Sequence, residues 1–74
     1  MRAMTAAPIS ISVNGAPREI AATSTLLALV EALGLRKELI AVELNRAIVS
    51  KNDYATVRLN AGDQIEIVEF VGGG

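Results

Sequence analysis

Residues 9–13 alternate isoleucine or valine with serine, which is the period-two pattern of a strand that buries one face. Asn14-Gly15 follows and predicts a tight turn, because both residue types tolerate a positive φ. With Ala16-Pro17 extending that turn, residues 18–21 are predicted to return beside the first strand. The fold is therefore expected to begin with a β-hairpin.

A helical pattern comes next. Apolar residues at spacings of three and four line one side of a helix, and they are Leu26, Leu29, Val30 and Leu33. The hydroxyl residues 23–25 are candidate N-caps, since their side-chain oxygens accept the first free N–H groups of a helix. Gly34 stands where a left-handed residue would end the helix. The pattern predicts a helix over residues 25–33.

The second half of the chain returns to strands and turns. Its segments are, in order, a connector at 35–38, a strand at 39–44, a turn at Asn45-Arg46, a short strand at 47–49, a loop or 3₁₀ turn at 50–55, a turn at 60–63 and a last strand at 64–70. The whole order predicts an α+β domain of the β-grasp type, a mixed sheet of four to five strands with one main helix packed across it. The order alone leaves other topologies open.

Three parts of the chain are expected on this basis. Residues 1–8 are predicted to be a flexible N-terminal extension, residues 9–71 the β-grasp domain and residues 72–74 a flexible glycine tail. The extension lacks the apolar core of a signal peptide, and polar residues interrupt every apolar run well short of a membrane span. We therefore expect a cytoplasmic protein with no membrane partner.

Composition narrows the possible chemistry. The 74 residues suffice for one domain, and 51% apolar content suffices for a core. A net charge of −1 and only two aromatic residues argue against a nucleic-acid partner. The chain has no cysteine and no histidine, which removes thiol nucleophiles, the usual general base and the commonest metal ligands. We expect no catalytic residues, no metal site and no bound cofactor.

The glycines at positions 72–74 are the clearest candidate for chemistry. Glycine lacks a Cβ, so a run of glycines after a strand can enter a channel too narrow for other residues. The four residues from Val71 can extend about 13 to 14 Å at ~3.3 to 3.6 Å each. One interpretation is that the Gly74 carboxylate reacts in another enzyme's active site, with Gly72 and Gly73 threading the channel. The other is a frayed and inert end.

Residues next to the tail are candidates for partner binding. Phe70 and Val71 either close the edge of the core or anchor a partner that directs the tail. Asp63, Glu66 and Glu69 are expected to form a solvated acidic rim, which could also meet a basic partner surface. Because Asp63 and Glu66 lie three apart on a strand, they face opposite sides and form no acid–base pair.

Two stretches carry a resemblance to a known family. Residues 40–49 read I-A-V-E-L-N-R-A-I-V, and residues 62–74 read G-D-Q-I-E-I-V-E-F-V-G-G-G. Together they resemble the ThiS family, the ubiquitin-like sulfur carriers of bacterial thiamine biosynthesis. The G-D-x-I-E-I-V run joined to the terminal glycines is the specific part, and the resemblance extends over residues 9–74.

The resemblance implies a function for the tail. In the family the terminal glycine, here Gly74, is adenylated by a ThiF-type enzyme that consumes ATP. Sulfur from a cysteine-desulfurase persulfide then converts it to a thiocarboxylate, which donates the sulfur to the thiazole synthase ThiG. Such a protein is a co-substrate of its partner enzymes. A chain that carries sulfur at its terminus needs no thiol of its own, in keeping with the absence of cysteine.

The chain departs from the family pattern at two places, and other functions are compatible with it. Ser50-Lys51 stands where many family members have Pro-Arg, and the extension before Ile9 is longer than usual. A MoaD-like carrier for molybdopterin shares the fold and the glycine end, although it commonly has prolines in the stretch before the tail. A carrier for another pathway, a ubiquitin-like modifier and a plain interaction module also fit the predicted fold.

Overall fold

The computed structural model describes residues 7–70. These residues form five strands, one α-helix and two short 3₁₀ helices. In chain order they are β1 (Ile9–Val13), β2 (Ala16–Ile20), α1 (Leu26–Ala32), η1 (Lys37–Leu39), β3 (Ile40–Leu44), β4 (Ala47–Val49), η2 (Lys51–Asp53) and β5 (Gln64–Glu69). The order agrees with the sequence prediction.

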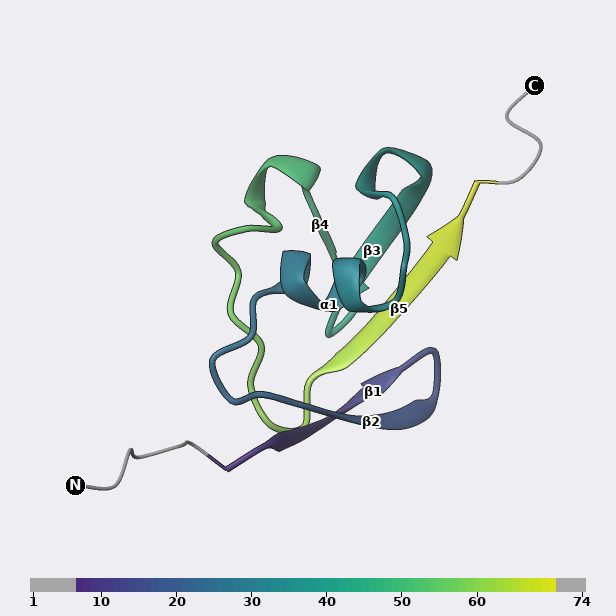
Figure 1. The fold of residues 1–74 in the computed structure, drawn as a ribbon. Helices are drawn as coiled ribbons and strands as arrows, with labels where there is room; N and C mark the ends of the chain where they lie inside the picture. Colours follow the sequence, from purple (N-terminus) through teal and green to yellow (C-terminus); the bar gives the residue numbers. More distant parts are fainter. Residues whose placement is uncertain (1–6, 71–74) are drawn as a thin grey trace.

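All five strands belong to one mixed sheet in the order β2-β1-β5-β3-β4. The central pair β1 and β5 is parallel, and the other three pairs are antiparallel. The helix lies across one face, and β5 runs between β1 and β3 and projects beyond the β1–β2 hairpin (Figure 1). This arrangement is the predicted β-grasp fold.

The first hairpin is tighter than the sequence suggested. Asn14 (φ 50°) and Gly15 (φ 85°) alone make the turn, and Ala16 already pairs with Val13. The prediction that Ala16-Pro17 extends the turn was therefore wrong. Pro17 is accommodated because β2 is an edge strand, where a residue without an N–H need not break a ladder on its outer side.

The helix and its ends agree with the prediction. The Thr25 hydroxyl oxygen accepts a hydrogen bond from the Ala28 N–H at 3.1 Å, and Gly34 follows the helix with φ 74°. The start of β3 and the end of β5 were each predicted one residue away from their position in the structure. Leu39 ends η1, whose 3₁₀ bonding takes it out of β3, and β5 ends at Glu69 instead of Phe70.

The core lies between α1 and the inner face of the sheet. Its buried members are Ile11, Leu26, Leu29, Val30, Ile40, Val42, Tyr54, Leu59, Ile65 and Ile67. Two of them, Ile65 and Ile67, come from β5, so the last strand contributes to the same core as α1. Tyr54 follows η2 directly and is only 1% exposed, so its ring is part of the core.

Candidate functional site

The predicted site residues divide at the limit of the described chain. Glu69 is the last residue of β5 and Phe70 follows it directly. Val71, Gly72, Gly73 and Gly74 lie outside the described residues. The geometry of the site is therefore that of the strand leading to the tail and of the surface around this strand.

The end of β5 is fixed on the side of β3. Residues 65–69 of β5 pair with β3, from Leu44↔Ile65 to Ile40↔Glu69. The Phe70 N–H continues the ladder by donating to the Leu39 carbonyl oxygen at 2.8 Å. Phe70 is nevertheless 55% exposed, so its ring is available for contact with another molecule. The chain thus leaves the sheet from an ordered, hydrogen-bonded residue.

An apolar patch lies on the sheet face turned away from α1. Val68 points to this open face because its neighbour Ile67 is buried on the helix side, and Phe70 follows the same alternation. The strand register places Ala41 opposite Val68, and β4 adds Ile48 on the same face. We call Ala41, Ile48, Val68 and Phe70 the open-face patch. Ile48 is 80% and Val68 61% exposed, which is unusual for side chains of this type.

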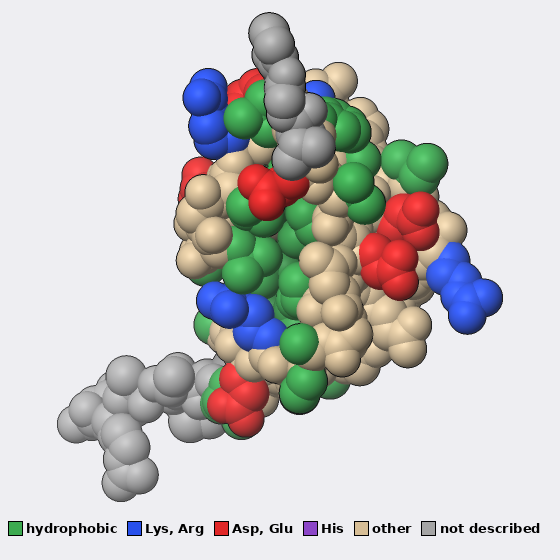
Figure 2. Space-filling view, turned by 90° about the vertical axis from the view of Figure 1, so that its right-hand side faces the viewer, with side chains coloured by type: hydrophobic (Ala, Val, Ile, Leu, Met, Phe, Trp, Pro, Cys, Tyr) green, Lys and Arg blue, Asp and Glu red, His purple; other side chains and the backbone are tan. Residues whose placement is uncertain are grey.

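Two carboxylates border the open-face patch. Glu43 and Glu66 are directly opposite each other in the β3–β5 register, and Ile48 lies opposite Glu43 on its other side. Both glutamates lie on the open face, since their strand neighbours Val42 and Ile67 are buried. Figure 2 shows hydrophobic side chains gathered on the side of the molecule where β5 ends, with acidic side chains beside them. An apolar patch with an acidic border suits a partner surface that is apolar with basic groups at its rim.

Asp63 does not belong to this acidic border. One of its carboxylate oxygens accepts a hydrogen bond from the Asn60 N–H at 2.8 Å, and the other accepts one from the Asn45 side-chain Nδ2 at 3.0 Å. These two hydrogen bonds fix the orientation of the Asp63 carboxylate, which the sequence alone did not predict. Its place in the 60–63 turn lets the side chain close that turn, which is a common use of aspartate. Glu66 is exposed on the open face, and Glu69 is exposed at the strand end.

Of the open-face patch, only Phe70 was expected from the sequence to contact a partner, and Glu43 was not predicted at all. Val68 interrupts the alternation of β5 and Ile48 makes β4 apolar at every position, so each was a visible local irregularity. Neither strand alone places them together. Only the register of β3 between β4 and β5 does so.

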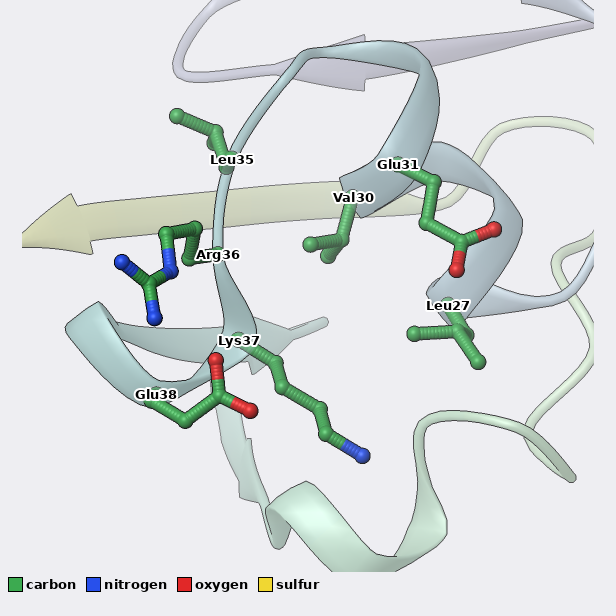
Figure 3. A pocket seen from close by; sticks show the side chains of 7 residues that line it. All are labelled: Leu27, Val30, Glu31, Leu35, Arg36, Lys37 and Glu38. Carbon is green, nitrogen blue, oxygen red and sulfur yellow. The ribbon is translucent and has the colours of Figure 1, made fainter.

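The described residues offer no other arrangement suited to chemistry. No charged residue of the range 7–70 is buried, and no three carboxylates in that range converge on a metal position. A cavity of about 250 Å³ opens between α1 and η1, lined by Leu27, Val30, Glu31, Leu35, Arg36, Lys37 and Glu38. Leu27 and Val30 project toward it from α1, and charged side chains of both signs surround its mouth (Figure 3). None of the helices in the described segment is long and apolar enough to cross a membrane.

Comparison with known proteins decides the family. The ThiS family model matches residues 11–74, which is most of the chain and includes the glycine tail. The chain belongs to the ThiS family. The family predicted from the sequence is thereby confirmed.

Individual relatives give the same assignment. The sulfur carrier protein ThiS of Bacillus subtilis is 42% identical over 52 residues, which are 70% of this chain and 79% of that protein. A crystal structure of the thiamine biosynthesis protein ThiS from Geobacter metallireducens superposes with a TM-score of 0.77 at 29% identity, over 89% of this chain and all of that one.

A longer relative links the family to an enzyme. The thiazole synthase of Magnetococcus marinus is 46% identical over 66 residues, which are 89% of this chain. The chain spans only 20% of the length of that thiazole synthase. A domain of this kind therefore occurs within a larger protein that is named for thiazole synthesis.

Proposed function

We propose that this protein is the sulfur carrier of thiazole formation in thiamine biosynthesis, with the Gly74 carboxylate as its reacting group. A ThiF-type enzyme adenylates this carboxylate with ATP and releases pyrophosphate. The outer sulfur of a cysteine-desulfurase persulfide then displaces AMP and gives an acyl disulfide. A thiol of the sulfur-donating system reduces this disulfide to the thiocarboxylate, which donates its sulfur to the thiazole synthase ThiG. The carrier is a co-substrate of these enzymes. ATP is consumed by the activating partner, and the carrier itself holds no cofactor.

The observation that carries this proposal is the position of the open-face patch. Val68 and Phe70 belong to the same strand end from which residues 71–74 continue, and the family match runs to residue 74. A partner that covers this patch therefore holds the chain four to six residues from the reacting carboxylate. Such a short tether gives the terminal group a high effective concentration in the partner's active site.

Thiazole synthase is the acceptor best supported among the sulfur-carrier pathways. The relatives that share 46% and 44% identity with this chain are both named thiazole synthase. A carrier domain within an enzyme's own chain is in keeping with functional coupling between the two. The chemistry requires an activating enzyme, because a carboxylate becomes an acyl donor only after a good leaving group is attached. The ThiF-type enzyme and the desulfurase are the partners that the family resemblance implies.

The proposal is tested by intact-protein mass spectrometry. The purified chain is incubated with a ThiF-type enzyme, ATP and a persulfide sulfur source, and a mass shift equal to the exchange of one oxygen for sulfur is expected. A chain lacking Gly73 and Gly74 is the control, and it should keep its fold while showing no shift. Adding ThiG with its substrates should reverse the shift. Absence of both adenylate and thiocarboxylate with active partners would refute the carrier function.

A further inference from the structure

The last strand is held unequally on its two sides. The Asn45 N–H donates to the Gln64 carbonyl oxygen and the Phe70 N–H to that of Leu39, so even-numbered residues of β5 bond toward β3. Odd-numbered residues consequently face β1. On that side the main-chain contact ends with the Asn14 N–H, which donates to the Ile65 carbonyl oxygen at 2.9 Å. The chain then turns away at Asn14 and Gly15, while β5 continues past the turn (Figure 1).

The side chain of Asn14 extends this ladder by one position. Its Oδ1 accepts the Ile67 N–H at 2.8 Å, and its Nδ2 donates to the Ile67 carbonyl oxygen at 3.2 Å. A carboxamide offers the same acceptor and donor as a peptide group, so Asn14 substitutes for the next residue of β1. This contact joins residues 53 positions apart and is partly shielded from water. Within residues 7–70, it is the last hydrogen-bonded contact on the β1 side of β5 before Phe70.

Asn45 makes a similar contact at the opposite end of β5. Like Asn14 it has φ 50° in a hairpin turn, and its Oδ1 accepts the Gln64 N–H at 2.9 Å. Asparagine tolerates this left-handed conformation better than most residues, which explains the residue type at both turns. The two asparagines therefore differ in the part of the strand that they hold. Asn45 holds the start of β5, and Asn14 holds the end that leads to the tail.

We propose that Asn14 is a positioning residue for the carrier reaction, and that it sets the direction of the end of β5, which leads to the reacting terminus. This inference rests on the function proposed above. With Asn14 in place, the last two-sided anchor, Ile67, is seven positions from Gly74; without it, the anchor is Ile65, nine positions away. Tether length alone changes the effective concentration only about 1.5-fold on −3/2-power scaling. The larger effect is on direction, because an end held only by β3 can swing about that single ladder.

The test compares Asn14→Gly with Asn45→Gly. Glycine keeps the left-handed turn in both cases and removes only the side-chain contacts. Asn14→Asp is a second variant, in which a carboxylate oxygen still accepts the Ile67 N–H but a second one faces the Ile67 carbonyl with no proton to donate. Urea denaturation gives the folded fraction of each variant, so that the kinetic values refer to folded protein.

Two readouts separate positioning from stability. Loss of the Asn14 contact should speed hydrogen exchange at the Ile67 amide about tenfold, relative to the Asn45 variant. In adenylation by the ThiF-type enzyme, the KM for the carrier should rise about three- to tenfold with kcat unchanged, since fewer free molecules present the tail in the binding direction. Asn45→Gly should leave that KM near the wild-type value.

The outcomes identify which idea fails. Equal KM values for the two glycine variants, with an active wild-type carrier, would overturn the positioning role and leave the sulfur-carrier function intact. A fall in kcat with unchanged KM would also overturn it. A wild-type chain that is not adenylated would refute the carrier function itself, and the role of Asn14 in that reaction with it.

Discussion

Arg46 adopts a backbone conformation that its side chain disfavours. It has φ 72° in the turn between β3 and β4, where Asn45 and Arg46 are both left-handed. The left-handed region costs a residue with a Cβ about 1–2 kcal/mol. Two left-handed residues are what the tightest hairpin turns require, so the strain follows from the geometry of the turn.

Arg46→Gly is expected to raise the free energy of unfolding by about 1 kcal/mol, because glycine adopts this conformation without strain. Urea denaturation measures the change. Arg36→Gly is the matched control, since Arg36 is also exposed but has φ −103°. The control should be neutral or destabilising. Equal effects at the two positions would show that loss of the arginine side chain, and not relief of backbone strain, causes the change.

Tyr54 couples the stability of the core to alkaline pH. Burial raises the pKa of Tyr54 above its ordinary value of about 10, because the charged phenolate is poorly solvated at the edge of the core. The unfolded chain therefore releases this proton at lower pH than the folded chain. Stability from this group is complete below pH ~10 and declines as the pH rises through the folded-state pKa.

The prediction is a loss of unfolding free energy above pH ~10 that Tyr54→Phe reduces. Chemical denaturation at a series of pH values measures it. The phenylalanine variant keeps the ring in the core and removes the ionisable group, so its curve should fall less steeply. A variant curve parallel to that of the wild type would assign the alkaline loss to other groups.

At the scale of single elements, the N-cap of α1 makes a measurable contribution to the free energy of unfolding. The helix has only seven residues, so its stability depends on its ends and on its buried side more than on propensity. Thr25→Ala should lower the free energy of unfolding by about 1 kcal/mol through loss of the bond to the Ala28 N–H. Thr23→Ala is the control at a nearby exposed threonine. Thermal denaturation of both variants should show a decrease only for Thr25.

Elements with local signals could be predicted from the sequence. The helix was found because Thr25 and Gly34 mark its ends, and the first hairpin because Asn14-Gly15 has few alternatives to a turn. The start of β2 was misplaced because proline in a strand is tolerated only at an edge, and which strand lies at the edge is not a local property.

Features that depend on pairing between strands could not be predicted in this way. The open-face patch needs β3 to lie between β4 and β5, and the Asn14 contact joins a turn to a strand 53 residues later. The sequence shows no partner for Asp63, because it is the fold that brings the Asn45 side-chain amide beside it. The order of the elements predicted the fold and the family resemblance supplied the role expected of the tail, but neither predicted these contacts.

At the scale of the whole molecule, the two faces of the sheet differ in their surroundings. The inner face packs on α1 and stabilises the fold, while the open face presents apolar side chains to solvent. Substitutions on the two faces should therefore separate partner binding from stability.

Phe70→Ala should weaken binding to the ThiF-type enzyme or to ThiG at least tenfold, as expected for an aromatic anchor, with little change in the melting temperature. Leu27→Ala, on the helix side beside the cavity, should lower the melting temperature and leave binding unchanged. Calorimetry of binding and of unfolding measures both quantities. A large loss of stability with unchanged affinity would show that Phe70 contributes to packing and not to partner binding.

The central parallel pair of β1 and β5 also has a consequence for synthesis on the ribosome. The first strand pairs with β2 early, but it gains its second neighbour only when residues 64–69 have been made, because β5 lies between β1 and β3. Until then the nascent chain lacks Ile65 and Ile67 from its core, and the edges of β1 and β3 that face β5 are unpaired. A chain that stops before β5 is therefore expected to remain unfolded and open to proteolysis. Completion of the fold depends on the same strand that leads to the glycines at positions 72–74.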